Sequence, residues 1–105
     1  MTSEELRVYL KNNCLGRDHA RKASELETAL HISENDLRRQ VNRLRRKNIP
    51  VCSGSEGYFY AAHAGEVVDT ILNLEEMLKG LQDSMSGLRG SLERFGETAA
   101  GGDDS

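Results

Sequence analysis

The densest chemistry in this sequence is a run of cationic side chains without an acidic neighbour. Residues 38–47 contain no Asp or Glu and six cations, which are Arg38, Arg39, Arg43, Arg45, Arg46 and Lys47. An arginine guanidinium can donate two hydrogen bonds to O6 and N7 of guanine, or to a phosphate. Asn35 and Asn42 accompany the run, and an amide can bridge N6 and N7 of adenine. These residue types predict a surface that binds double-stranded DNA.

The apolar residues around this run predict one amphipathic helix. At 100° per residue, Leu37, Val41 and Leu44 lie within about 60° of one another and would form its buried stripe. The opposite face carries Asn35, Arg39, Asn42, Arg43 and Arg46, with Arg38 and Arg45 at one side. A basic helix face can also be merely solvated, and that alternative stays open. Solvated faces normally mix both signs of charge, however, whereas this run carries only one.

Three short helices and a hairpin are expected to position the basic face. The first helix begins at Thr2 or Ser3 and ends at Asn12–Asn13, and a second spans about 22–30. Ser33 then caps a third helix that continues to about Lys47. Two extended segments, 49–53 and 57–61, are joined by a turn that contains Gly54 and Gly57, which predicts a β-hairpin. A long helix follows and ends at Gly96.

The order and wording of these elements resemble the winged helix-turn-helix family. The run LETALHIS at 26–33 is similar to the family's LAxxLGIS turn, LRRKNIPV at 44–51 to LRxxGxPI, and GYFY at 57–60 to the wing strand. The likeness covers about residues 3–62 and is closest to the DNA-binding domain of biotin-operon-type repressors. The whole chain resembles small winged-helix proteins of phages and prophages. His31 and Asn48 replace the family's glycines, and both types tolerate the positive φ expected there.

The resemblance implies a role for each candidate residue, because the N-terminal part of the family's recognition helix meets the bases. The residues expected to read bases are Asn35, Arg38, Arg39 and Asn42. Those expected to bind phosphate are Arg43, Arg45, Arg46 and Lys47. Lys22 and Ser24, at the start of the second helix, are expected to add backbone contacts. Ser53, Ser55 and Glu56 at the hairpin tip include no cation, so the wing itself is not expected to grip phosphate.

The last third of the chain carries a heptad seam, which is the second strong pattern. Its apolar residues alternate by four and three positions, and they are Val67, Ile71, Leu74, Leu78, Leu81, Met85, Leu88, Leu92 and Phe95. This 3.5-residue average keeps one stripe facing a partner helix. We therefore expect a homo-oligomer, with a dimer as the simplest form. Val68 and Leu72 lie outside the seam and are expected to pack on the preceding domain.

Two features of the long helix stay open from sequence. It could fold back on its own domain, although nine seam positions exceed what three short helices can cover. The mixed Leu, Ile and Met positions and the few flanking charges also favour neither parallel nor antiparallel pairing. Gly80, Gly87 and Gly90 fall at outward positions, and each costs about 1 kcal/mol of helix stability relative to alanine.

Composition excludes several classes of function. Net charge is −3, yet residues 1–62 hold eleven Lys/Arg against eight Asp/Glu, whereas residues 63–105 hold three against nine. The positive charge is thus segregated where it could meet DNA. Cys14 and Cys52 are isolated and the three histidines share no spacing, so no metal site is expected. We see no cofactor motif, small-molecule ligand, nucleophile–base set, signal peptide or membrane span.

The sequence thus predicts a mainly α-helical protein with a small β-hairpin, organised in three parts. Residues 1–62 are expected to form a winged helix-turn-helix domain, 66–96 an oligomerisation helix, and 97–105 a disordered acidic tail. The predicted function is non-enzymatic, sequence-specific DNA binding by a cytoplasmic dimer that regulates transcription or replication. The alternative is an interaction module that does not bind DNA and assembles through the long helix.

Overall fold

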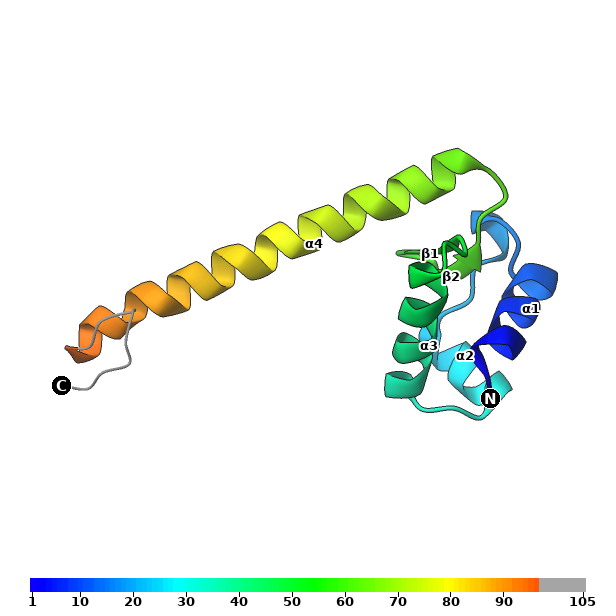
Figure 1. The fold of residues 1–105 in the computed structure, drawn as a ribbon, viewed down its shortest axis with the longest axis horizontal. Helices are drawn as coiled ribbons and strands as arrows, with labels where there is room; N and C mark the ends of the chain where they lie inside the picture. Colours follow the sequence, from blue (N-terminus) through cyan, green and yellow to red (C-terminus); the bar gives the residue numbers. More distant parts are fainter. Residues whose placement is uncertain (97–105) are drawn as a thin grey trace. The chain divides into compact units, whose positions relative to one another are not determined.

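The computed structural model describes residues 1–96, and it is mainly helical with one small β-hairpin, as the sequence predicts (Figure 1). The elements in these residues are α1 Ser3–Asn13, a 3-10 turn η1 Arg17–His19, α2 Ala23–Leu30, α3 Glu34–Arg46, β1 Val51–Gly54, β2 Gly57–Tyr60, α4 Ala64–Ser91 and a 3-10 turn η2 Leu92–Phe95. The expected acidic tail, 97–105, lies outside the described residues. The chain divides into two compact units, Met1–Ile71 and a second that begins at Leu72.

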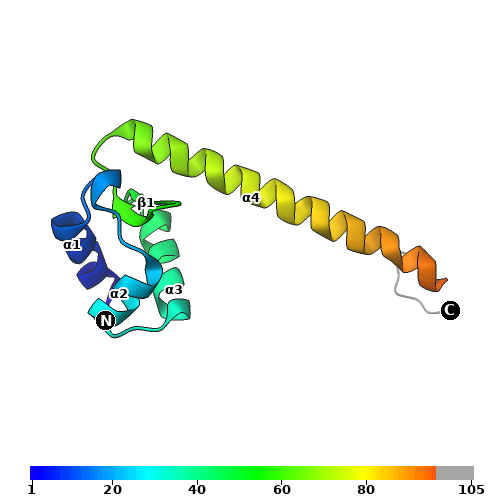
Figure 2. The same ribbon diagram turned by 180° about the vertical axis from the view of Figure 1, so that it is seen from behind.

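The first unit is built around a small core between its helices and its hairpin (Figures 1 and 2). The buried stripe predicted for the third helix is confirmed, since Leu37, Val41 and Leu44 are at most 2% exposed. They meet the other buried apolar residues, which are Leu6, Leu10, Cys14, Leu26, Val51, Cys52 and Phe59. α3 contacts both α1 and α2, and β1 as well. One face of α3 is therefore used to hold the unit together.

Local capping sets where the helices begin. The Thr2 hydroxyl accepts a hydrogen bond from Glu5 N–H at 3.1 Å, and the Glu5 carboxylate accepts one from Thr2 N–H at 2.7 Å. Ser33 Oγ accepts from Asp36 N–H at 3.1 Å, so the predicted cap of α3 is confirmed. These side chains satisfy N–H groups that have no partner inside the helix.

Residues in the left-handed conformation follow α2 and α3. The positive φ expected at His31 and Asn48, which replace glycines of the winged helix-turn-helix family, is confirmed. His31 has φ 56° and Asn48 has φ 66°. After each of them the next amide reaches back, with Ile32 N–H bonding to Glu27 O and Ile49 N–H to Leu44 O. This arrangement closes the helix and reverses the chain. The tight turn between α2 and α3 and the exit toward β1 both follow from it.

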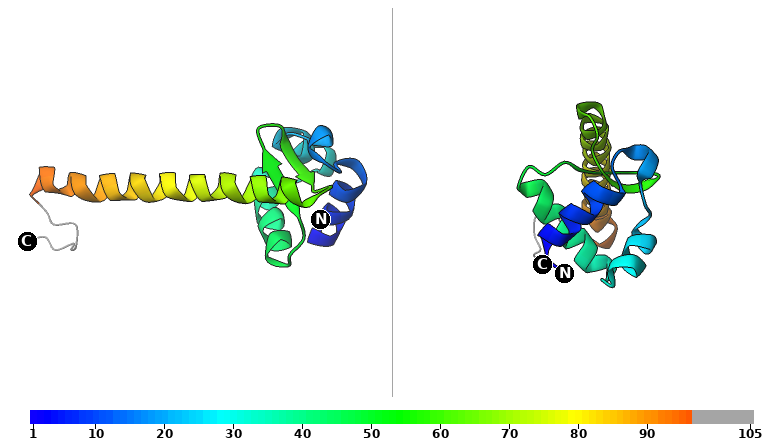
Figure 3. Two further views of the ribbon diagram at one scale, coloured as in Figure 1. Left: turned by 90° about the horizontal axis from the view of Figure 1, so that it is seen from above. Right: turned by 90° about the vertical axis from the view of Figure 1, so that its right-hand side faces the viewer.

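The hairpin is hydrogen-bonded to a third backbone segment, the connection between α1 and α2, which the sequence does not reveal. β1 and β2 pair in antiparallel register, with Cys52 opposite Phe59. The free edge of β2 bonds to the connection between α1 and α2 (Figure 3), through Gly16 N–H to Tyr60 O at 2.7 Å and Arg21 N–H to Tyr58 O at 3.0 Å. Gly57 has φ 120°, and a Cβ there would lie 2.2 Å from Arg21 O. Only glycine fits this crossing.

The first two turns of α4 belong to the first unit, so the domain extends beyond the expected boundary at residue 62. Glu66 and Thr70 are buried, and Val67 packs against the core. The Glu66 carboxylate accepts from Arg17 N–H at 2.9 Å and Ala62 N–H at 2.8 Å, while Thr70 Oγ1 accepts from Ser53 N–H at 3.3 Å. The expected packing of Val68 and Leu72 is wrong, because they are 52% and 55% exposed.

α4 itself is helical to Ser91, and η2 carries the chain on to Phe95. Gly96, where the sequence predicts the end of the long helix, has φ 77° and caps this last turn. Gly80, Gly87 and Gly90 lie within α4, and a Cβ at any of them would meet nothing within 4 Å. Nothing within the described residues therefore requires glycine at these three positions.

Candidate nucleic-acid interface

The face of α3 opposite the buried stripe is solvent-exposed and carries the residues predicted to meet DNA. These exposed residues are Asn35, Arg38, Arg39, Asn42, Arg43, Arg46 and Lys47. We call them the α3 face. Because Leu37, Val41 and Leu44 are buried in the core, the opposite side of the helix, which carries the α3 face, is turned away from the core. A helix is the element that fits the major groove of B-form DNA.

The N-terminal half of the α3 face is less positive than the sequence count suggests. Arg38 pairs with Glu34 at 3.2 Å, and Arg39 pairs with Asp36 at 3.1 Å. Both acids lie just before residue 38, where they also favour the positive end of the helix dipole. Exposed ion pairs of this kind contribute about 0–1 kcal/mol, so a phosphate or base can replace the acid. In the unbound protein each of the two arginines therefore has an acidic partner that a bound anion can replace.

The C-terminal half of the α3 face carries positive charge without acidic partners. Within residues 1–96, Arg43, Arg46 and Lys47 make neither an ion pair nor a side-chain hydrogen bond. Asn42 lies beside them, exposed and equally without a side-chain hydrogen bond. Within the described part of the chain, these three cations need break no ion pair to bind an anion. This half is the strongest candidate for contact with a polyanion.

Arg45 does not share this freedom, which changes the role we assign to it. Its Nε donates to Val51 O at 2.8 Å and its Nη2 donates to Ser53 Oγ at 3.0 Å. Burial lowers the pKa of this guanidinium from its ordinary value, because desolvation disfavours the charged form. Arg45 joins α3 to β1 and is a positioning residue. The sequence pattern could not separate it from its neighbours, since its spacing is that of a surface cation.

The two candidates at the start of α2 differ in the same way. Lys22 Nζ donates to Ser55 O at 2.9 Å, so the amine holds the hairpin turn that itself lacks a cation. Ser24 is exposed in the first turn of α2. Lys22 therefore brings positive charge to the hairpin tip. Sequence reasoning placed this charge on α2 alone, since the contact joins residues that lie far apart in the chain.

A buried carboxylate outside the α3 face fixes the start of α4, and sequence reasoning missed it. The side chain of Glu66 is 8% exposed. Hydrogen bonds from the backbone N–H groups of Ala62 and Arg17 lower its pKa below the ordinary value of 4.5. Arg17 also pairs with Asp69 at 3.0 Å. A single acid in an otherwise unremarkable helix start gave no signal, because its partners are backbone groups from other segments.

The seam of α4 is exposed from Ile71 onward, unlike Val67. The large apolar residues at these positions are 38–76% exposed, and they are Ile71, Leu74, Leu78, Leu81, Met85, Leu88 and Phe95. Leu92 is partly buried. Val67, predicted to face a second chain, packs instead on the core of its own domain. We call the eight positions from Ile71 to Phe95 the free seam. Exposed apolar stripes of this length mark interaction surfaces.

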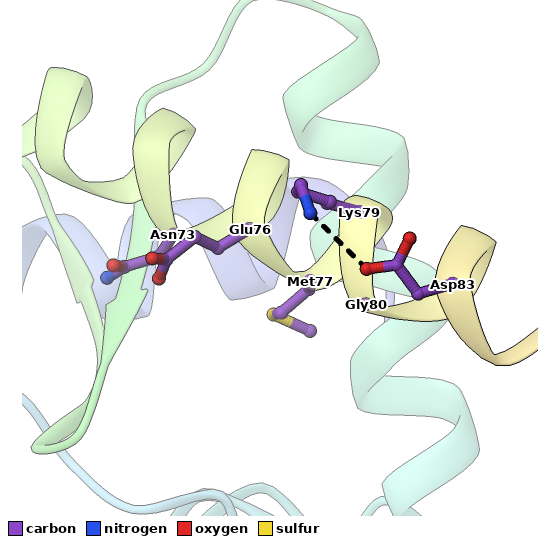
Figure 4. A pocket seen from close by; sticks show the side chains of 6 residues that line it. All are labelled: Asn73, Glu76, Met77, Lys79, Gly80 and Asp83. Atoms are coloured by element: carbon purple, nitrogen blue, oxygen red, sulfur yellow. Dashed lines mark hydrogen bonds and ion pairs between the residues drawn. The ribbon is translucent and has the colours of Figure 1, made fainter.

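The other surface of α4 carries an open hollow. The hollow, of about 590 Å³, lies along this helix. Its lining residues, labelled in Figure 4, all come from α4, among them Asn73, Met77 and Gly80. Lys79 and Asp83 form an exposed ion pair at 3.3 Å along it. A single helix cannot surround a ligand, so the hollow is an open flank. Within the described residues no group of His, Cys, Asp and Glu could hold a metal ion.

The cysteines and the helix lengths give two further observations on residues 1–96. Cys14 and Cys52 are buried free thiols, and burial raises the pKa of each. None of the helices in residues 1–96 has the length and apolar character needed to cross a bilayer.

Comparison of the chain with protein families, with curated proteins and with solved structures finds no match. The chain's own residues therefore carry the functional inference.

Proposed function

We propose that this protein binds double-stranded DNA with sequence preference through the α3 face, as a winged helix-turn-helix domain, and that it acts as a homo-oligomer assembled by α4. The observation that carries the proposal is the group Arg43, Arg46 and Lys47, which is exposed and forms no ion pair within residues 1–96. It lies on a helix whose other side is buried in the core. Such a protein would be a regulator of transcription or replication.

The division of labour along α3 follows from its contacts. Arg43, Arg46 and Lys47 bind phosphates, because they are exposed, near one another in the chain and in no ion pair within residues 1–96. Asn42 lies among them, and Asn35 and Arg39 lie nearer the start of the helix, where their amide and guanidinium groups read base edges. Arg39 exchanges Asp36 for a guanine or a phosphate. Arg45 and Lys22 hold the hairpin in place beside α3.

The contacts of the hairpin with the helices support the interpretation of residues 1–62 as a winged helix-turn-helix domain. β2 is bonded on one edge to β1 and on the other to the α1–α2 connection. Arg45 bonds β1 to α3. The hairpin and the proposed recognition helix thus form one body, and this lets both contact the same duplex without an ordering cost.

Two arginine substitutions separate attraction from specificity and test the proposal. Arg46→Ala should weaken binding to all duplexes alike, and should lower the slope of log affinity against log salt by about one. Arg39→Ala should cost about 1–3 kcal/mol at the preferred site and relax the choice of one base pair. The matched control is Lys79→Ala, which removes an exposed cation from α4. It should leave binding to DNA unchanged.

The measurement is fluorescence anisotropy with duplexes selected from a random pool, and with scrambled versions, over a salt series. Absence of wild-type binding at low salt would contradict the proposal. So would affinities that Arg39→Ala and Arg46→Ala leave at the wild-type level. Either result would leave self-assembly through α4 as the activity of the chain, which is the interaction-module alternative.

A further inference from the structure

The free seam has a symmetry that becomes visible once Val67 is assigned to the domain core. Its eight positions are Ile71, Leu74, Leu78, Leu81, Met85, Leu88, Leu92 and Phe95, and its midpoint falls at residue 83. With Ile71 at heptad position a, the seam begins at an a position and ends at a d position. In an antiparallel pair of helices, a positions pack in layers with d positions of the partner. A seam with this pattern can satisfy every layer against a second copy of itself.

We propose that α4, together with η2, which carries Leu92 and Phe95, binds a second copy of this chain in antiparallel orientation, with residue 83 at the two-fold axis. The inference deepens the oligomer of the proposed function by naming the direction and register of its helices. In this register Ile71 packs with Phe95 of the second copy, and Leu74 with Leu92. Leu78 then packs with Leu88, and Leu81 with Met85. None of the eight residues is left without a partner.

The charges beside the seam match this arrangement. Glu75, Gln82 and Arg89 occupy successive e positions, and e positions face one another across an antiparallel pair. Glu75 then lies opposite Arg89 of the second copy, twice in the dimer, and Gln82 lies opposite itself. Neither Glu75 nor Arg89 has an ion pair within the described part of the chain. In a parallel pair Glu75 would face Thr70, and Arg89 would face Ser84, so neither charge would meet its opposite.

The other flank matches by size. The successive g positions after Thr70 are Met77, Ser84 and Ser91. In the antiparallel register Met77 lies opposite Ser91 of the second copy, and Ser84 lies opposite itself at the axis. Met77 is 62% exposed, the most of the three methionines, so a small partner gives it room to pack. A parallel pair would place Met77 against Gln82 instead.

The two ends of the free seam also differ in a complementary way. Near its start, Val68 and Leu72 widen the apolar surface beside Ile71. At its end, Phe95 is exposed and is the only aromatic residue in α4 or η2. Antiparallel pairing brings the phenyl ring of one copy over the widened surface of the other. Parallel pairing would leave Val68 and Leu72 uncovered. The start, the centre and the end of the seam therefore favour the same orientation.

Spin labels on the outward side of α4 test the orientation directly. Glu76, Asp83 and Gly90 occupy the same heptad position, f, one heptad apart, and all three are exposed. Each is replaced by cysteine in turn, labelled, and the distance between labels in the dimer is measured by pulsed electron resonance. Wild type is the labelling control, because Cys14 and Cys52 are buried. Antiparallel pairing predicts the shortest distance at 83, and an axial offset of about 21 Å at both 76 and 90.

Charge reversal gives an independent readout of the register. Glu75→Arg or Arg89→Glu alone should weaken the dimer about tenfold in low salt, because each creates two repulsive pairs. The double variant Glu75→Arg/Arg89→Glu should restore wild-type association. The matched control is Glu76→Arg, the same change at an outward position, which should have no effect on the dissociation constant.

The outcomes separate this inference from the proposed function, because no experiment here contains DNA. Equal label distances at the three sites would mean parallel pairing and would overturn the proposal. A protein that stays monomeric would overturn it as well, while DNA binding by single domains could persist. Antiparallel distances in a protein that binds no duplex would support the pairing and contradict the DNA-binding proposal instead.

Discussion

The two units of this chain use apolar residues in opposite ways. In Met1–Ile71, ten apolar residues are at most 3% exposed and form one core. In the unit that begins at Leu72, the leucines Leu78, Leu81 and Leu88 are 56–69% exposed. The first unit buries its core within one chain, whereas the second, as far as residue 96, consists of the rest of α4 and of η2 and has nothing else to cover its apolar side chains. The stability of the first unit should therefore be independent of protein concentration, whereas the stability of the second should rise with it.

Glycine shows the same contrast. In the first unit Gly16 has φ 84° and Gly57 has φ 120°. Gly57 also lies close to the backbone of Arg21. In α4, Gly80, Gly87 and Gly90 lie in open space. The first unit depends on its glycines for its geometry, and α4 tolerates its own at a cost in helix stability. Substitutions can therefore separate the two units.

The largest expected effect comes from a lysine in the free seam. Leu81→Lys removes about 1.5–3 kcal/mol of apolar burial from each copy, and adds the desolvation of an ammonium group. The dissociation constant of the dimer should rise at least about a hundredfold. Light scattering or sedimentation equilibrium measures it. The unfolding of the first unit should not change. A wild-type protein that is monomeric at high micromolar concentration would remove the basis for this contrast.

A core truncation should act on the opposite unit. Phe59→Ala leaves a cavity in the core of Met1–Ile71, and should lower the free energy of unfolding by about 3–5 kcal/mol. Urea unfolding followed by circular dichroism and tyrosine fluorescence measures it. Val8→Ala is the control, because Val8 is exposed in the same unit and should cost little. Equal losses for Val8→Ala and Phe59→Ala would argue against the core as described.

Alanine at glycine positions should give opposite signs in the two units. Gly80→Ala and Gly87→Ala should each stabilise α4 by about 1 kcal/mol, since the added methyl groups meet nothing. Gly57→Ala should destabilise the first unit, because its Cβ would overlap Arg21 O. Thermal unfolding at matched concentrations compares the three variants. Stabilisation by Gly57→Ala would show that β2 does not cross the connection as described.

The smallest expected effect is on the acid limb of the stability curve, which is the part where the free energy of unfolding falls as the pH is lowered. Backbone hydrogen bonds from Ala62 and Arg17 hold the pKa of Glu66 below its ordinary value of 4.5. Its contribution is therefore present above that pH, and it is lost as the pH falls through the lowered value. Glu66→Gln should make the acid limb shallower in urea titrations at several pH values. Glu4 and Glu5, whose pKa values are also lowered, should keep part of the slope, and an unchanged slope would contradict the buried role of Glu66.

Sequence reasoning succeeded where the cause is local. The stripe Leu37, Val41 and Leu44, the Ser33 cap and the positive φ of His31 and Asn48 depend on residues a few positions apart. The hairpin was predicted for the same reason, although its strands are shorter than expected.

Contacts between distant segments could not be predicted in the same way. The bonds of β2 to the α1–α2 connection, Lys22 to Ser55, and Glu66 to Arg17 join parts of the chain whose proximity only the fold creates. Heptad spacing alone could not show that Val67 is used by its own domain, because the seam pattern passes through it without interruption. The acids that pair with Arg38 and Arg39 were visible in sequence, but lay outside the counted run.

The burial of Glu66 and Thr70, and the packing of Val67 on the core, show where the chain can be divided in protein engineering. A fragment that stops in the loop after β2 would leave the Arg17 and Ala62 amides without their acceptor and would uncover part of the core. A junction after Ile71 keeps these groups satisfied. Coiled coils of other lengths or oligomeric states could be grafted there in heptad register. The domain would then become a transferable cassette whose valency is chosen by the helix attached to it.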